Sequence, residues 1–208
     1  MEHRLDMTMM FATHDALRRE LERIAKAAAR TGDDPRRVLK TALGWELFKK
    51  YLHIHHTTED DVLWPALERN LADRPDELAL LAALEAEHAG IDPLLAAVDE
   101  ALADRDHGHE GLAGLVDALA TGLTAHLRHE ENEGLALIDA TLNEQEWESF
   151  GQVHGQRVGD HASTYLPWLL DDIDPYRTAV ILNRMPAPLV RAYHTEWKAT
   201  YGELTLYP

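Results

Sequence analysis

The sequence predicts an all-α protein: an antiparallel, up-down-up-down four-helix bundle followed by a short helical C-terminal extension. Apolar residues recur every three or four positions along four long segments, which is the spacing of a helix with one buried face. Only short connections separate these segments, so consecutive helices should be antiparallel neighbours. We expect the bundle to occupy residues 1–142 and the extension to occupy residues 143–208.

The first two helices are predicted over residues 6–30 and 34–71. Met10, Leu17 and Ile24 lie on one stripe of the first segment. The second segment starts at Asp34 followed by Pro35, an N-cap residue with proline at the first helical position. Both segments are therefore long enough to cross a small domain from end to end.

The third and fourth helices are predicted over residues 75–105 and 110–142. Leu84 and Ile91 mark the buried stripe of the third helix, and Leu119 and Leu123 mark that of the fourth. After residue 143 the composition changes, because aromatic residues become frequent and prolines divide the chain into short helices. We expect this extension to pack on the bundle or to form a contact between two copies of the chain.

Composition limits the possible partners. The chain has 37 acidic residues against 20 Lys and Arg, a net charge of −17, and no basic patch of the kind that binds nucleic acid or an anionic membrane. No apolar run reaches the roughly 18–20 residues that span a bilayer, and the stretch MEHRLDMTMM has no apolar region of signal-peptide length. We expect a cytoplasmic protein without nucleic-acid or membrane partners. With no cysteine, thiolate metal sites are excluded.

Histidine and glutamate repeat with helical spacing on the second and fourth helices. His55 precedes Glu59 by four residues, and His126 precedes Glu130 by four. Residues at this spacing share a helical face, and the apolar stripes place that face toward the core. His14 lies on the inward stripe of the first helix. His88 lies on that of the third, with Asp92 one turn later.

Antiparallel packing brings these four histidines to similar heights in the bundle, because each lies a similar distance from the connecting loops. One inward histidine alone would be read as a core residue with a hydrogen bond. Four histidines and two buried glutamates at one level predict a metal site, because two uncompensated buried carboxylates cost several kcal/mol. Nitrogen and oxygen ligands without sulfur suit iron, manganese or zinc, and two bridging carboxylates suit a pair of ions.

The remaining histidines are assigned to the surface or to packing. His53, His56 and His129 are expected to point away from the inward stripe, with His56 and Asp60 forming a solvated pair or a pair just outside the site. The other assignments are loop positions or tail positions on the surface or in packing: His107, His109, His154, His161 and His194.

Residues 5–142 resemble the hemerythrin-like proteins of the HHE cation-binding class. The resemblance rests on four motifs, MTMMFATHDALRREL, HHTTEDDVLWP, EHAGIDPLL and HLRHEENEGLALI. It implies a four-helix bundle with two iron ions per chain, joined by an oxo group and carboxylates, and manganese or zinc as possible substitutes. By motif, His14 and His55 would bind one iron, His88 and His126 the other, and Glu59 and Glu130 would bridge them. The tail resembles extensions of some bacterial members.

Two departures from the oxygen-carrying hemerythrins stand out. Those proteins have a second histidine one turn after the first in the third helix, where this chain has Asp92, a possible ligand. Their bridging aspartate follows the fourth-helix histidine by five residues; here Glu130 follows by four and Glu131 takes the fifth place. As a ligand, Asp92 would add negative charge and favour the ferric state; without a bond to iron, it would leave a coordination position open. Both alternatives argue against reversible oxygen carriage.

The leading functional hypothesis is a non-haem di-iron protein that binds peroxide, O2 or NO. If it is an enzyme, it would be an oxidoreductase with catalase-like or peroxide-reducing activity. The alternative is an iron or oxygen sensor without turnover, with the extension as its output surface and a homodimer formed through it. The third hypothesis is a metal-free bundle that serves as an interaction scaffold. Asp60 and Glu131 would orient ligands or move protons from outside the first ring of ligands.

Overall fold

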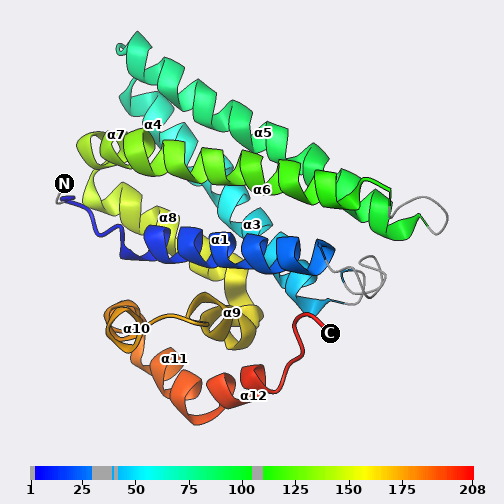
Figure 1. Ribbon diagram of the computed structural model, residues 1–208. Coiled ribbons are helices and arrows are strands. Elements are labelled where there is room, and N and C mark those ends of the chain that lie inside the picture. Colours follow the sequence, from blue (N-terminus) through cyan, green and yellow to red (C-terminus); the bar gives the residue numbers. More distant parts are fainter. Residues whose placement is uncertain (1–2, 30–38, 40–41, 105–109) are drawn as a thin grey trace.

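Long helices lie side by side in the computed structural model, and shorter C-terminal helices cover one side of them (Figure 1). The structure describes residues 3–29, 39, 42–104 and 110–208. Along the bundle the chain runs up, down, up and down, with neighbouring α5 (Pro75–Ala103) and α6 (Leu112–His129) antiparallel. The predicted all-α fold is confirmed. Among the helices that the structure describes, none combines the length and the apolar composition that crossing a bilayer requires.

The predicted first helix is α1 (Thr8–Ala28), and the predicted second helix comprises three consecutive segments. The second helix runs through α3 (Leu43–Thr58), a π-helical turn at Glu59–Leu63 and α4 (Trp64–Asn70). The predicted start at Asp34 and Pro35 lies outside the described residues. Proline at the first helical position does start α5, at Pro75.

The fourth bundle helix has the same three-part construction as the second. It runs through α6, a π-helical turn at Glu130–Gly134 and α7 (Leu135–Thr141). Each π turn adds one residue to a helical turn, so it shifts the buried face. The two turns begin at Glu59 and at Glu130, the two glutamates that the sequence assigns to the site.

The extension begins at an N-cap and continues as short helices. Asn143 accepts a hydrogen bond from the backbone of Glu146, whose side chain in turn accepts from the Asn143 backbone, and this capping box starts α8. The elements that follow are α8 (Glu144–Val158), a 3₁₀ turn (Gly159–His161), α9 (Ala162–Leu169), α10 (Pro175–Leu182), α11 (Ala187–Ala192), a π turn (Tyr193–Trp197) and α12 (Lys198–Gly202).

The extension shares a hydrophobic core with the bundle. Trp168 and Leu169 of α9 are fully buried in the same apolar cluster as Leu17 of α1 and Phe48 of α3. Tyr51 of α3 packs its ring 4.7 Å from that of Trp168. The covering helices are therefore held by apolar burial, the strongest stabilising term in folding.

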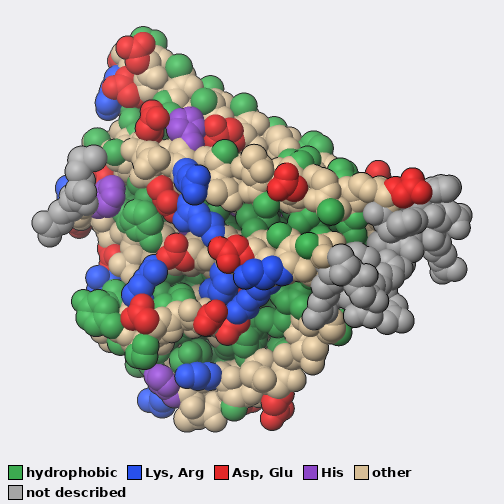
Figure 2. Space-filling view, viewed as in Figure 1, with side chains coloured by type: hydrophobic (Ala, Val, Ile, Leu, Met, Phe, Trp, Pro, Cys, Tyr) green, Lys and Arg blue, Asp and Glu red, His purple; other side chains and the backbone are tan. Residues whose placement is uncertain are grey.

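Ion pairs join the surface of α1 to the extension. Arg23 pairs with Asp171 at 2.6 Å, and Arg177 pairs with Asp15. Figure 2 shows basic and acidic side chains interspersed over the face that α1 occupies in Figure 1. Exposed pairs of this kind contribute little each, so we assign the docking of the extension mainly to its buried aromatic residues.

Candidate metal centre

A layer of polar side chains separates two hydrophobic clusters inside the bundle. On α1, Met10 belongs to one cluster and Leu17 to the other, and His14 lies between them. On α5, His88 lies between Leu84 and Ile91 in the same way. The second and fourth bundle helices place their histidine–glutamate pairs at this level too. All six residues are buried: His14, His55, Glu59, His88, His126 and Glu130.

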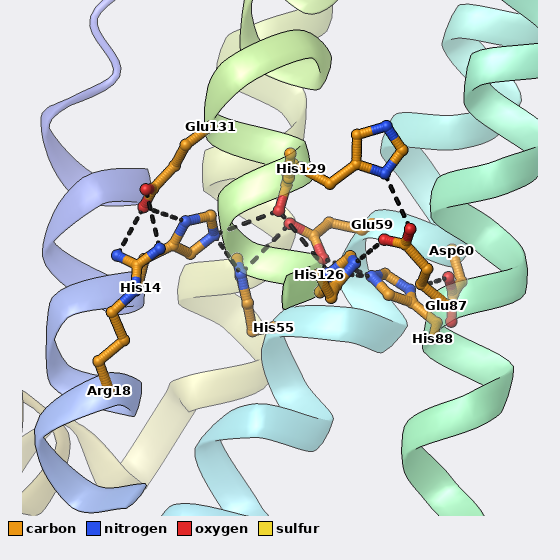
Figure 3. Close-up of polar contacts among 11 residues, drawn as sticks. His14, Arg18, His55, Glu59, Asp60, Glu87, His88, His126, His129 and Glu131 are labelled. Atoms are coloured by element: carbon orange, nitrogen blue, oxygen red, sulfur yellow. Dashed lines mark hydrogen bonds and ion pairs between the residues drawn. The ribbon is translucent and has the colours of Figure 1, made fainter. Parts of the chain in front are cut away.

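One group of four side chains lies between α1, α3 and α6. His14, His55, Glu59 and Glu130 each offer a ligand atom, and these atoms lie within 4.8 Å of one another. The Nε2 atoms of His14 and His55 are 3.1 Å apart. His14 Nε2 lies 3.3 Å from Glu130 Oε2, and His55 Nε2 lies 3.3 Å from Glu59 Oε1. Two histidine nitrogens and two carboxylates thus lie close together, and Figure 3 shows the side chains of His14, His55 and Glu59 turned toward one another.

A second group lies beside the first, between α3, α5 and α6. His56, His88 and His126 offer ring nitrogens within 4.8 Å of one another. The Nε2 atoms of His88 and His126 are 3.0 Å apart. The carboxylates of the first group reach this one as well, since Glu59 Oε2 is 3.5 Å from His88 Nε2 and Glu130 Oε2 is 3.9 Å from His126 Nε2. Both glutamates therefore lie between the two groups.

Carboxylates outside the layer hold the outer nitrogens of three histidines. The Nδ1 atoms of His14, His88 and His126 lie 2.9, 2.8 and 3.0 Å from Glu131, Asp60 and Glu87. An ionised carboxylate only accepts hydrogen bonds, so each Nδ1 carries a proton, and the ring in its neutral, metal-binding form has an Nε2 lone pair that faces inward. This carboxylate–histidine arrangement is the usual support of a metal-binding imidazole.

The buried carboxylate oxygens provide the test of whether a cation fits. Both oxygens of Glu59 and both of Glu130 lack a hydrogen-bond partner among the described residues, and so does His56 Nε2. Buried polar atoms without partners are rare and costly. Two lone pairs facing each other at 3.0 Å, on His88 and His126, also repel unless a proton or a cation lies between them. The donor set fits a pair of metal ions.

In the absence of metal, protons take over part of this compensation. Burial and the negative charge of Glu130 raise the pKa of Glu59 well above its usual value. Burial lowers the pKa of His14, but Glu130 and Glu131 outweigh it and raise this pKa to about 9. The pKa of Glu131 falls to about 2, because hydrogen bonds to His14 and Arg18 outweigh its burial. Arg18 holds both Glu131 oxygens at 2.8 Å.

His56 is a correction to the sequence analysis. It was expected to point away from the core in a solvated pair with Asp60; instead it is buried, and its ring stacks on that of His88 with centroids 4.0 Å apart. Asp60 contacts His88 rather than His56. Consecutive helix residues are about 100° apart and an inward stripe is at least about that wide. His55 and His56 therefore face α1 and α5 from the two edges of one stripe.

Asp92 is the second correction, because it is exposed and lies in neither group. The buried stripe of α5 follows alternating steps of three and four residues through Leu81, Leu84, His88 and Ile91. The residue that follows His88 on this stripe is thus Ile91, and Asp92 falls beside it. A possible ligand role for Asp92 is not supported by this geometry.

Two residues of the site were missed from sequence. One carboxylate oxygen of Glu87 accepts a hydrogen bond from His126 Nδ1. The other oxygen accepts one from His129 Nδ1 at 2.8 Å. His129 is half-buried rather than directed away from the site. Glu87 directly precedes His88, as Glu131 directly follows Glu130. Adjacency to an inward ligand was the available signal, because such neighbours border the stripe.

The other histidines divide between the surface and the extension. His53, His161 and His194 are exposed. His154 of α8 is half-buried, and burial, assisted by the charge of Arg157, lowers its pKa to about 4. Its ring centroid lies 6.4 Å from that of His55. The predicted loop positions His107 and His109 lie outside the described residues.

Comparison with known proteins decides the family. The hemerythrin HHE cation binding domain family matches residues 6–138, which is more than half of the chain.

The chain belongs to the hemerythrin HHE cation-binding family. It is also similar to a BRUTUS-like zinc finger protein of Arabidopsis thaliana, with 23% identity over 186 residues that cover 79% of this chain. The match spans only 15% of that relative's length. No solved structure matches the chain significantly. Membership in the hemerythrin HHE family agrees with metal binding by the two groups of ligands.

Metal binding by this hemerythrin-family chain should release protons. The raised pKa values mean that metal-free protein holds a proton on His14 below about pH 9 and on Glu59 above the usual carboxyl range. A metal ion must displace both. We expect Zn²⁺ titrations, followed by calorimetry in buffers of different ionisation enthalpy, to release more protons near pH 6, where His14 holds its proton, than above pH 9, where it has lost it.

The variant Glu131→Gln provides the control for this proton count. It removes a charge that raises the pKa of His14, so the pH above which the release declines should be lower than in the wild type. A proton count that does not change with pH would contradict this account of the metal-free site.

Proposed function

We propose that this chain is a non-haem di-iron protein of the cytoplasm that binds and consumes a small oxidant, with peroxide as the first candidate. The observation that carries the proposal is the pair of adjacent ligand groups with Glu59 and Glu130 between them. Glu59 turns one oxygen toward each group, and Glu130 Oε2 lies near a histidine of each, so both carboxylates would be shared by the two ions. Two iron ions would supply Lewis acidity and one-electron redox change to the bound oxidant.

The residues of the chain would position the ions and keep water out of the ligand layer. His14 and His55 would hold one ion, and His56, His88 and His126 the other, with the proton of three rings fixed on Nδ1 by carboxylates. The hydrophobic clusters on either side of the layer exclude water, which strengthens every electrostatic interaction within it. The His14–His55 group therefore has two histidine ligands, and the other group has three.

The test is metal content together with repeated peroxide turnover. Anaerobically loaded protein should hold about two irons per chain and consume many equivalents of H₂O₂. Glu130→Gln should abolish that consumption, because it removes a shared carboxylate. Asp92→Asn is the matched control and should keep both metal and activity, since Asp92 is exposed and lies outside both groups. Consumption that stops after one equivalent would refute the enzymatic part of the proposal.

His56 has a separate expected effect. His56→Ala should weaken one ion far more than the other, because His56 belongs to only one ligand group. The loss of affinity should exceed the roughly 10- to 100-fold typical of losing a group that merely orients a ligand. His53→Ala, an exposed histidine on the same helix, should leave both ions in place. Equal weakening of both ions by His56→Ala, measured by competition with a chelator, would contradict this assignment.

A second candidate function is a sensor in which the extension reports the state of the metal. It is favoured by contacts between the extension and α1 near His14. Tyr165 lies 3.3 Å from the hydroxyl of Thr13, the residue next to His14, and Tyr207 donates to the buried Glu20 at 2.8 Å. A shift of α1 on metal loading would be transmitted to these contacts.

Limited proteolysis of metal-free, ferrous and ferric protein separates the two candidates. A sensor should show different cleavage of residues 143–208 in the three states, or a change between monomer and homodimer. Identical protection in all three states would exclude the sensor and leave the oxidant-consuming protein.

A further inference from the structure

A cavity of about 510 Å³ lies between α1, α8 and the helices of the extension. Its walls are mainly apolar and include Met10 of α1, Phe150 of α8 and Leu189 of α11. The volume falls within the roughly 300–1,000 Å³ typical of small-molecule sites. Because α8, α9 and α11 contribute much of the wall, the cavity exists only where the extension covers the bundle.

The uncharged polar groups of the cavity lie together, apart from Gln152, which is exposed. Thr13, Tyr165, His55 and His154 line it. The Thr13 hydroxyl donates to the backbone oxygen of Met9 at 3.0 Å, so it can only accept from Tyr165. His154 has no hydrogen-bond partner within the part of the chain that the structure describes. An imidazole without a partner in an otherwise apolar wall is a free hydrogen-bonding position.

Charge is confined to the mouth of this cavity. Glu148 and Arg184 are the charged lining residues among those described; both are exposed, and Arg184 is already paired with Asp6. A charged ligand entering the interior would lose its hydration without meeting an opposite charge, which is costly. The lining therefore selects against ions.

We propose that this cavity binds a neutral, mainly apolar organic molecule with one hydrogen-bonding group, seated against His55 and His154. The molecule would lie beside a histidine of the candidate metal centre, with its apolar part against the methionines and leucines of the wall. Binding itself requires neither iron nor turnover, so it stands or falls independently of the proposed function.

Two fluorescent probes with similar ring systems test the chemistry of the occupant. N-phenyl-1-naphthylamine is neutral with one N–H group, and 8-anilino-1-naphthalenesulfonate carries a sulfonate. Titrated into the purified full-length chain, the neutral probe should bind saturably at one site per chain, at least about tenfold more tightly than the anionic probe. Absence of saturable binding, or equal affinity for both probes, would overturn the proposal.

Filling the cavity from two walls locates the binding site. Gly155→Leu and Leu189→Trp add volume at two lining positions and should each weaken the neutral probe by at least about tenfold. Gly114→Leu is the matched control: a Cβ added at Gly155 or at Gly114 meets no atom within 4 Å, and Gly114 lies on the exposed side of α6, away from the cavity. Unchanged affinity in both filling variants would place the probe elsewhere and refute the site.

Discussion

Adding Zn²⁺, or Fe²⁺ under anaerobic conditions, to the metal-free protein should raise its melting temperature by about 8–16 °C. A ligand that binds only the folded state at 1,000 times its Kd stabilises it by about 4 kcal/mol, and a chain of this size gains about 2–4 °C per kcal/mol. The physical reason is the pair of buried glutamates, whose four oxygens have no hydrogen-bond partner among the described residues.

The double substitution Glu59→Gln with Glu130→Gln should remove this response to metal. Without metal, the same variant should be close to the wild type in stability, because it removes two buried carboxylates whose oxygens have no hydrogen-bond partner among the described residues. Glu85→Gln with Asp92→Asn is the control, because both are exposed carboxylates of α5. A metal-free glutamine variant that melts well below the wild type would mean that the two glutamates are structural residues instead.

Replacing Trp168 by alanine should destabilise the whole chain. Its side chain is fully buried, and its ring lies 4.7 Å from Tyr51 of the bundle and 6.0 Å from Tyr165 of the extension. Removing a buried tryptophan costs about 3–5 kcal/mol, so thermal unfolding should begin about 6–20 °C lower. The measurement is a melt followed at once by circular dichroism and by tryptophan fluorescence.

Trp147→Ala is the matched comparison, since Trp147 is half-buried and stacks on Phe150 near the start of α8. Trp147→Ala should lower the melting temperature by clearly less than Trp168→Ala does. If Trp168→Ala instead unfolds only residues 143–208 while the bundle melts at its usual temperature, the extension is an independent unit. A single lowered transition would show that bundle and extension unfold together.

Much of the fold could be predicted because its pattern is local. A helix with one buried face has apolar residues at every third or fourth position of its sequence. Four such helices joined by short connections can pack in only a few ways. The same stripes placed His14, His88 and the two histidine–glutamate pairs inside, and the structure brings their side chains to one layer. The spacing of residues in the sequence is enough to predict that a side chain points inward and how high in the bundle it lies.

What spacing does not carry is the width of a stripe or a change in its phase. His56 is adjacent to a residue already counted as inward, and it is buried because α3 has neighbours on both sides. The predicted ligand role of Asp92 is not supported, because the next buried residue of α5 after His88 comes three positions later, at Ile91, and not four. The π turns at Glu59 and Glu130 depend on how the backbone accommodates the two carboxylates. They could not be predicted, because no residue type marks their positions in the sequence.

The enclosure of the ligand layer has a kinetic consequence. Its six principal side chains come from all four long segments of the bundle, and each is at most 5% exposed. An ion held there would join parts of the chain more than 100 residues apart, as His14 and Glu130 show, so its release requires ligands on different helices to move apart. Exchange of metal should therefore be paced by transient opening of the bundle. Once loaded, such a centre would hold its ions for as long as the helices stay together.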